Sequence, residues 1–233
     1  MIFLRSAPPS RLLFISGLQR EARIARAADA LALCGSGEML RAKLAKVATP
    51  LQLTISFGLC GGLDPALRSG DIVIGTSALA GGAAVLADES ITRDLAARLQ
   101  AAGERVSVGA VAGVDAPVLT RLAKAELRKA TMAAAVDMES HIAARLAADR
   151  KSPFAILRVV SDPACRDLPR LVTKAVRPDG SVDLGAVAFG VIRSPEQMLG
   201  LIATARDSAI AFAALRRCRR LPGLFSGLGL AHL

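Results

Sequence analysis

The strongest constraint on the fold is a regular alternation between short apolar runs and segments with helical periodicity. Six runs predict strands: Leu12–Ser16, Leu51–Phe57, Asp71–Thr76, Val106–Ala112, Ala134–Met138 and Ala155–Ser161. Several are apolar on both faces, as strands are in a parallel sheet that helices cover on both sides. The sequence therefore predicts an α/β fold: a single domain with a mixed, mostly parallel twisted sheet flanked by helices.

Helical segments separate these strands. We expect helices at Arg20–Asp29, Glu38–Val47, Ser90–Ala102, Thr120–Lys129, Ser140–Ala148 and Pro195–Arg217. The last has the clearest start, because Ser194 can cap its first turn and Pro195 suits the first helical position. The domain is expected to cover residues 1–217, closed by this long helix, with residues 218–233 as an apolar C-terminal tail.

Charge is concentrated at the two ends of the chain. The 30 basic and 20 acidic residues give a net charge of +10, yet residues 51–200 are nearly neutral. The chain has no Trp or Tyr that could stack on bases and no nucleic-acid recognition motif. We therefore expect no nucleic-acid partner. The apolar share of 52% is enough for a sizeable core.

Several chemistries lack their sequence signatures. No Gly-Lys dipeptide and no Gly-x-Ser-x-Gly elbow occurs, which excludes a P-loop and an elbow-type triad. Four separated cysteines and two histidines do not give the spacing of a metal site, so no metal is expected. Arg5 and Arg11 interrupt the first apolar run and no signal-peptide cleavage site follows it, so we expect a cytoplasmic protein.

Glycines cluster where the second strand is expected to end. The segment Phe57-Gly58-Leu59-Cys60-Gly61-Gly62-Leu63-Asp64-Pro65 predicts a glycine-rich bend followed by a turn. Glycines in such a bend let backbone N–H groups face an anion or a sugar hydroxyl. A tight turn without a ligand is the alternative reading.

Two further strands deliver acidic side chains at their carboxyl ends. The run Val136-Asp137-Met138-Glu139 leads from one strand into a helix, and Val159-Val160-Ser161-Asp162 ends another. Ligands of open α/β sheets bind outside the carboxyl ends of the strands. Glu139 and Asp162 are therefore predicted to converge on one crevice, although helix capping is the alternative for each of them taken singly.

Together these segments resemble the superfamily of nucleoside phosphorylases and methylthioadenosine/adenosylhomocysteine nucleosidases. The glycine bend followed by Gly70-Asp71, the Val136–Glu139 run and the Val160–Asp162 strand end have the family's order and spacing. The resemblance extends over about residues 12–212. Within the superfamily, the sequence of residues 56–65 is most similar to that of the hopanoid-associated phosphorylases, which are credited with releasing adenine from adenosylhopane.

The resemblance implies cleavage of the N-glycosidic bond of an adenine nucleoside with a hydrophobic 5′ group, through an oxocarbenium-like transition state. Asp162 matches the acid that protonates the purine N7, and Glu139 matches the carboxylate that holds the ribose hydroxyls. Met138 matches the residue beneath the ribose, and Ser161 matches one that orients the base. The other positions that it implies for substrate binding are Asp137, Val118 and, in the bend that faces the nucleophile, Gly58, Cys60 and Gly61.

The resemblance leaves the nucleophile open between phosphate, as a co-substrate, and water. In the nucleosidases an acid after the first strand activates water, and Glu21 is the candidate, although a gapless alignment places Ala22 there. Leu59 stands where many members carry Ser or Thr, and Pro117 replaces the usual aromatic of the base-stacking loop. No cofactor is implied. A methylthioadenosine/adenosylhomocysteine nucleosidase and a catalytically silent nucleoside-binding relative are the alternatives.

Two kinds of partner beyond the substrate are expected. The resemblance implies a homo-oligomer, a dimer or higher. Four arginines, Arg216, Arg217, Arg219 and Arg220, precede an uncharged tail, which suggests peripheral contact with an anionic membrane. In that hypothesis Leu224, Phe225 and Leu228 enter the bilayer surface, and a frayed helix end with a loose tail is the alternative.

Overall fold

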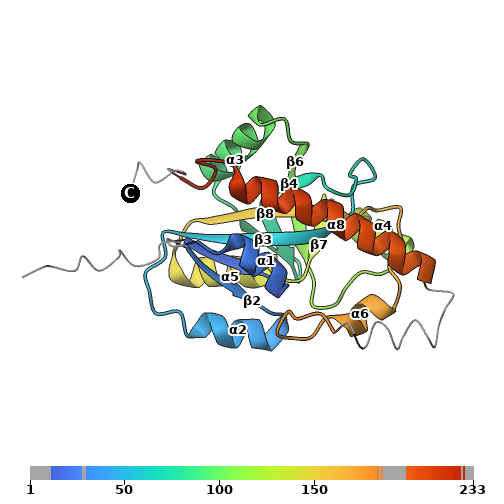
Figure 1. Ribbon diagram of the computed structural model, residues 1–233. Coiled ribbons are helices and arrows are strands. Elements are labelled where there is room, and N and C mark those ends of the chain that lie inside the picture. The colour runs from blue at the N-terminus through green and yellow to red at the C-terminus, as the bar shows by residue number, and fades with distance from the viewer. Residues whose placement is uncertain (1–11, 28–29, 184, 186–197, 227, 229–233) are drawn as a thin grey trace, which may run out of the picture.

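The computed structural model describes residues 12–27, 30–183, 185, 198–226 and 228 of the chain (Figure 1). Its strands form one eight-stranded sheet. They are β1 (Leu12–Ser16), β2 (Ala30–Cys34), β3 (Leu53–Gly62), β4 (Ile72–Ala80), β5 (Ala83–Leu86), β6 (Val106–Gly113), β7 (Ala135–Asp137) and β8 (Phe154–Asp162).

The order of the strands brings the ends of β3, β7 and β8 together. The sheet runs β2-β1-β3-β7-β6-β4-β5, and β8 pairs with β3 and β4. The β1–β2, β1–β3, β3–β8, β4–β6 and β6–β7 pairs are parallel, whereas β3–β7, β4–β5 and β4–β8 are antiparallel. In this register Gly61 pairs with both Val136 and Asp162. The mixed, mostly parallel sheet confirms the predicted fold class.

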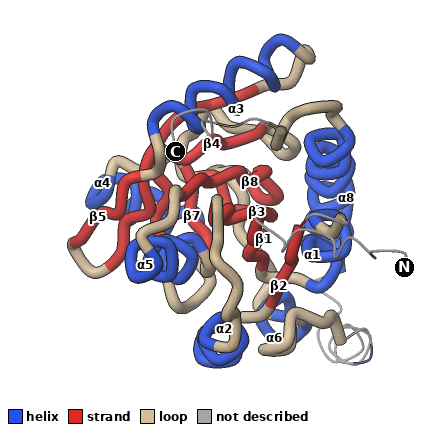
Figure 2. The backbone as a smooth tube through the Cα atoms, turned by 90° about the vertical axis from the view of Figure 1, so that its left-hand side faces the viewer, coloured by secondary structure: helices blue, strands red, loops and turns tan. Residues whose placement is uncertain are grey.

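Helices cover both faces of the sheet. On one face lie α1 (Gln19–Ala25), α3 (Glu89–Ala101) and α8 (Met198–Arg220), and on the other lie α2 (Gly37–Ala45) and α5 (Ser140–Arg150) (Figure 2). α4 (Arg121–Thr131) packs through Leu127 against a small buried cluster that consists of Leu63, Ala112, Ala133 and Val136. The short α6 (Leu171–Ala175) follows β8. Each face has its own hydrophobic core, as the two-sided apolar strands predict.

Two strands and one strand end differ from the sequence prediction. The six predicted strands are all present, but β2 and β5 were not predicted, since β2 is only five residues of Ala, Leu and Cys and β5 is an exposed edge strand. β3 continues to Gly62 instead of bending after Phe57. The prediction of a glycine-rich bend was therefore wrong, because hydrogen bonds to β8 and β7 hold these glycines extended.

The C-terminal helix and the residues after it belong to the core. The predicted start of the helix at Ser194 and Pro195 lies outside the described residues, and α8 is helical from Met198 to Arg220. By length and apolar content α8 could cross a membrane, but its inner side, including Phe212 and Leu215, packs on the sheet.

The side chains proposed for membrane contact have other positions. Leu224, Phe225 and Leu228 are buried, and the Phe225 ring lies 5.1 Å from that of Phe14. Arg217 pairs with Glu104, and Arg219 donates to the carbonyl of Ala25 and lies over the Phe14 and Phe225 rings. Insertion of the tail into a bilayer is therefore excluded in this conformation, because its apolar groups complete the protein core.

Candidate active site

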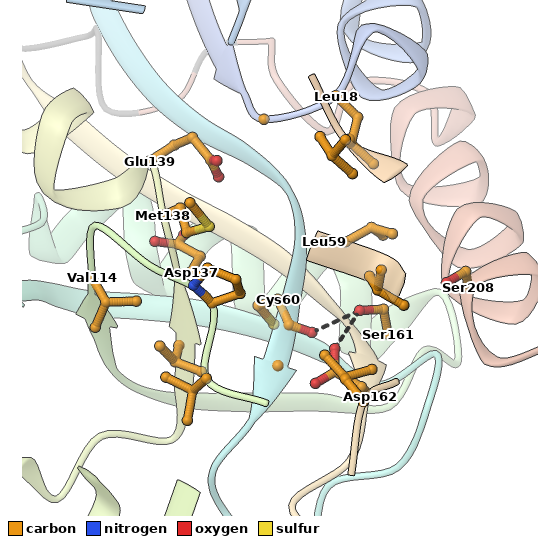
Figure 3. A pocket seen from close by; sticks show the side chains of 18 of the residues that line it. Leu18, Leu59, Cys60, Val114, Asp137, Met138, Glu139, Ser161, Asp162 and Ser208 are labelled. Carbon is orange, nitrogen blue, oxygen red and sulfur yellow. Dashed lines mark hydrogen bonds between the residues drawn. The ribbon is translucent and has the colours of Figure 1, made fainter. Parts of the chain in front are cut away.

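A cavity of about 340 Å³ opens where the ends of β3, β7 and β8 meet α1, the size of a small-molecule site. The residues with candidate chemistry in its wall are Glu21, Cys60, Gly61, Asp137, Met138, Glu139, Ser161 and Asp162. Figure 3 shows Glu139 and Asp162 at opposite ends of the cavity, with Met138 and Cys60 between them. Among the described residues that line it, none is Lys or Arg.

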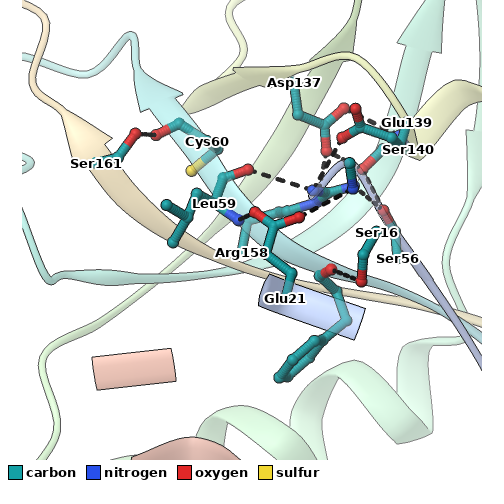
Figure 4. A network of polar contacts seen from close by, with 12 residues as sticks. Ser16, Glu21, Ser56, Leu59, Cys60, Asp137, Glu139, Ser140, Arg158 and Ser161 are labelled. Atoms are coloured by element: carbon teal, nitrogen blue, oxygen red, sulfur yellow. Dashed lines mark hydrogen bonds and ion pairs between the residues drawn. The ribbon is translucent and has the colours of Figure 1, made fainter. Parts of the chain in front are cut away.

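A fully buried arginine organises the Glu139 end of the cavity. Arg158 on β8 lies 2.6 Å from the Asp137 carboxylate and 3.2 Å from that of Glu139 (Figure 4). Its guanidinium also donates to Ser56 Oγ at 2.5 Å and to the carbonyl of Leu59 at 3.2 Å. Because buried charges need partners, the acids and the arginine hold one another in fixed orientations.

Glu21 enters the same cavity from α1. It is buried, and its Oε2 accepts from the N–H groups of Gly17 and Leu18 at 2.9 and 2.8 Å. Its Oε1 accepts from the N–H of Leu59 at 2.8 Å. Ala22, the other candidate for this position, is packed in the core. Glu21 is therefore the acid that the structure brings to the site from this part of the chain.

Two glycines are required because carboxylates lie against their backbones. A Cβ on Gly17 would stand 2.6 Å from Glu139 Oε1, and one on Gly58 would stand 2.7 Å from the Glu21 carboxyl carbon. Any side chain at either position would displace an acid. Gly58 itself does not line the cavity, so its part in the site is to leave room for Glu21.

Asp162 occupies the other end, at the tip of β8. Its Oδ1 accepts from Ser161 Oγ at 2.7 Å, and Ser161 Oγ also lies 3.2 Å from the carbonyl of Cys60. Its Oδ2 lies 2.7 Å from the ammonium of Lys124, which is fully buried. Burial raises the pKa of Asp162, and Lys124 opposes this rise. The carboxyl is therefore suited to exchange a proton nearer to neutral pH than an exposed aspartate.

The rest of the wall is largely apolar. Val114, Pro117 and Val118 come from the loop after β6, and the other apolar side chains are Leu18, Leu59, Val136, Leu168, Val172 and Val176. Thr204 and Ser208 reach the cavity from α8. This wall favours an apolar ligand group over a charged one.

The acids at the Arg158 end outnumber the guanidinium. Burial raises the pKa of Glu139 to about 8, opposed by Arg158 and supported by the charges of Asp137 and Glu21. Burial likewise raises the pKa of Glu21, while Arg158 and three backbone N–H groups lower it. One guanidinium cannot compensate three buried carboxylates, so proton binding to this cluster is favoured near neutral pH.

This cluster should make stability depend on pH. Because the folded pKa of Glu139 is above its unfolded value, its contribution is complete below about pH 4.5 and is lost as pH rises through about 8. We expect the melting temperature of the wild type to fall between about pH 5 and 8, and Glu139→Gln to flatten this slope. Calorimetric melting of both proteins, with the exposed Glu126→Gln as control, tests this. Equal slopes in all three would contradict the assignment to Glu139.

The structure brings most of the predicted site residues together. Nine of them line one cavity: Glu21, Cys60, Gly61, Val118, Asp137, Met138, Glu139, Ser161 and Asp162. The predicted convergence of Glu139 and Asp162 on one crevice is therefore confirmed. Asp137 turns its carboxylate to Arg158 and to the N–H and hydroxyl of Ser140, so it acts as a support for the site rather than as a free ligand group.

Arg158 and Lys124 were missed by the sequence analysis. Arg158 interrupts the apolar run of β8, and a charge inside a strand that is buried on both faces implies a buried counter-charge. That signal was available. Lys124 gave no comparable signal, because it lies on α4 among exposed charged residues and its burial follows from how the helix docks.

Comparisons with known proteins agree with this geometry. Residues 44–189 match the model of a protein family described as the phosphorylase superfamily. No curated protein matches the chain in sequence.

Solved structures share the fold at low sequence identity. Futalosine hydrolase of Helicobacter pylori superposes with a TM-score of 0.65 at 12% identity, covering 91% of this chain and 95% of its own. The methylthioadenosine/adenosylhomocysteine nucleosidase of Neisseria meningitidis, in complex with methylthio-immucillin-A, gives 0.63 at 18%, covering 90% and 97%. AMP nucleosidase of Bacteroides thetaiotaomicron gives 0.56 at 18%, covering 66% and 81%.

Proposed function

The chain belongs to the phosphorylase superfamily, and from that premise we propose that it hydrolyses the N-glycosidic bond of an adenine nucleoside. The observation that carries the proposal is the joint presence of Glu21, Glu139 and Asp162 in one cavity. Cleavage of this bond needs a proton for the leaving base, a group that stabilises positive charge on the sugar, and a nucleophile. Asp162 can supply the proton, Glu139 can stabilise the charge on the sugar, and Glu21 can activate water as the nucleophile.

The two ends of the cavity bind different parts of the substrate, the base at one end and the ribose at the other. Asp162 protonates the purine N7, so that the base leaves neutral, and Ser161 fixes the orientation of this carboxyl. Glu139 faces the ribose hydroxyls and the charge that develops on the ring, and Met138 packs beneath the sugar. The bond between C1′ and the base breaks as a bond from C1′ to the nucleophile forms.

Water fits the remaining space better than phosphate. The described lining carries four acids, Glu21, Asp137, Glu139 and Asp162, and no cation that could compensate a phosphate dianion. The guanidinium of Arg158 is already engaged by Asp137, Glu139 and Ser56. Glu21 can accept a proton from water as the water oxygen attacks C1′. Hydrolysis therefore suits the charge of this site.

The apolar wall supports a substrate with an uncharged, hydrophobic 5′ group. Leu18, Leu168, Val172 and Val176 offer no partner for a 5′-phosphate. Adenosylhopane, to which the resemblance points, and methylthioadenosine both meet this requirement. Among these we propose adenosylhopane, which would place the protein in the formation of hopanoid side chains.

Adenine release tests the proposal directly. We expect release from adenosylhopane and methylthioadenosine, no release from AMP, and no change of rate when phosphate is added. In H₂¹⁸O the heavy oxygen should appear at C1 of the ribose product. Phosphate-dependent release with a ribose 1-phosphate product would assign phosphorolysis instead. Binding of these nucleosides without any release would favour a silent relative.

A further inference from the structure

A lysine behind the cavity wall is tied to the acid at the base end. Lys124 is fully buried and does not line the cavity. Its Nζ lies 2.7 Å from Asp162 Oδ2 and also donates to the carbonyl oxygens of Asp162, Pro163 and Arg166 at 3.3, 3.0 and 3.1 Å. The ammonium therefore holds both the carboxylate and the backbone loop that follows it.

This arrangement is specific in its chemistry. A buried ammonium is costly unless it has a counter-charge and hydrogen-bond acceptors. Three N–H groups meet four acceptors here, so every donor of Lys124 is used. Among the described residues, Asp162 supplies the only carboxylate that accepts a hydrogen bond from it. Holding the loop alone would need only the carbonyl contacts, whereas the 2.7 Å contact fixes the orientation of the acid itself.

We propose that Lys124 is a positioning residue for Asp162, which holds its carboxyl toward the base and sets the pH range in which it carries the proton. The inference rests on the proposed function, since it assigns a purpose to the pair within that reaction. Lys124 lies behind the wall and touches no part of the substrate. It acts only through Asp162.

The charged groups around Asp162 give the sign of the effect. Lys124 approaches from α4, and Asp207 approaches from α8, itself paired with Arg166 at 3.0 Å. Cys60 faces it from β3, and burial keeps this thiol protonated by raising its pKa well above the usual range. Burial and Asp207 raise the pKa of Asp162, whereas Lys124 lowers it. Loss of the ammonium charge therefore leaves Asp162 protonated to higher pH.

Lys124→Gln separates charge from hydrogen bonding, because the amide keeps N–H donors for the carbonyl groups. We expect kcat to fall by about 10-fold or more, the lower end of what a misplaced acid costs, with little change in KM. The alkaline limb of the kcat–pH profile should move to higher pH by about one pH unit or more, as expected when a carboxyl loses its cationic partner. The exposed Lys129→Gln is the matched control on the same helix and should behave as the wild type.

Two further measurements separate positioning from a general structural role. In the double variant with Asp162→Asn, Lys124→Gln should cause no additional loss, because Lys124 acts only through the acid. The ¹³C carboxyl resonance of Asp162, followed by NMR in wild type and variant, should titrate at higher pH once Lys124 is replaced.

Additive losses, an unchanged alkaline limb, or identical Asp162 titrations would each overturn the inference. If the wild type releases no adenine under any condition, the proposed function fails. The NMR titration still decides in that case whether Lys124 governs the ionisation of Asp162. Lys124→Met, which removes the donors as well, should show a larger loss than Lys124→Gln.

Discussion

Asp162→Asn is expected to lower kcat for adenine release by about 10²-fold to 10⁴-fold, the range that a positioned general acid contributes. The asparagine amide can keep the contacts to Ser161 and Lys124 but has no acidic proton to give. The purine must then leave as an anion. Steady-state adenine release from methylthioadenosine, measured across pH 6 to 9, checks this.

A change of leaving group distinguishes lost proton transfer from lost structure. A riboside of 4-nitrophenol leaves readily as an anion, so Asp162→Asn should cleave it at close to the wild-type rate. Asp64→Asn is the matched control, since Asp64 pairs with Arg128 at 2.8 Å and does not line the cavity. Equal losses with both substrates would mean that Asp162 supports the fold of the site instead of protonating the base.

The sequence predicts best those site residues that directly follow an apolar strand. Asp162 and Glu139 each follow an apolar strand, and ligands of open α/β sheets bind beyond the carboxyl ends of strands, so the sequence pattern predicts that both acids reach one crevice. The pattern does not give the strand directions, since β8 runs parallel to β3 whereas β7 runs antiparallel to it. The glycine segment does lie at the site, but the sequence predicted a bend where the structure has an extended strand. Its glycines reflect the close approach of Glu21 to Gly58 and of Asp162 to Gly61, contacts between segments far apart in sequence.

The partners of the acids are less accessible to sequence reasoning. The apolar setting of Arg158 signals a buried charge but does not name its counter-ions, which come from β7 and from the start of α5. Lys124 is buried because α4 places its ammonium against the end of β8 and the residues that follow it. The tail was misjudged for a similar reason, since an uncharged end rich in Leu and Phe fits a core as well as a membrane.

Glu21→Gln is expected to reduce hydrolysis by about 10²-fold to 10⁴-fold, because glutamine cannot take the proton of the attacking water. The substitution also disturbs the hydrogen bonds that fix the Glu21 side chain. Both carboxylate oxygens of Glu21 accept backbone N–H groups, from Gly17, Leu18 and Leu59. An amide must turn its NH₂ toward one of these donors, so some loss of stability accompanies the loss of rate, and melting curves should be recorded with the kinetics.

Azide rescue isolates the chemical role of Glu21 from this structural cost. Azide attacks C1′ without giving up a proton, so it needs no base, and removal of the carboxylate charge also lowers the repulsion of an anion in an acidic cavity. In Glu21→Gln, azide should restore adenine release with a ribosyl azide as product, while phosphate should not. Glu104→Gln, which removes an ion pair with Arg217 outside the cavity, should keep the wild-type rate. Full activity of Glu21→Gln in water would eliminate Glu21 as the base. Phosphate-dependent activity in that variant would identify phosphate, not water, as the nucleophile that attacks C1′.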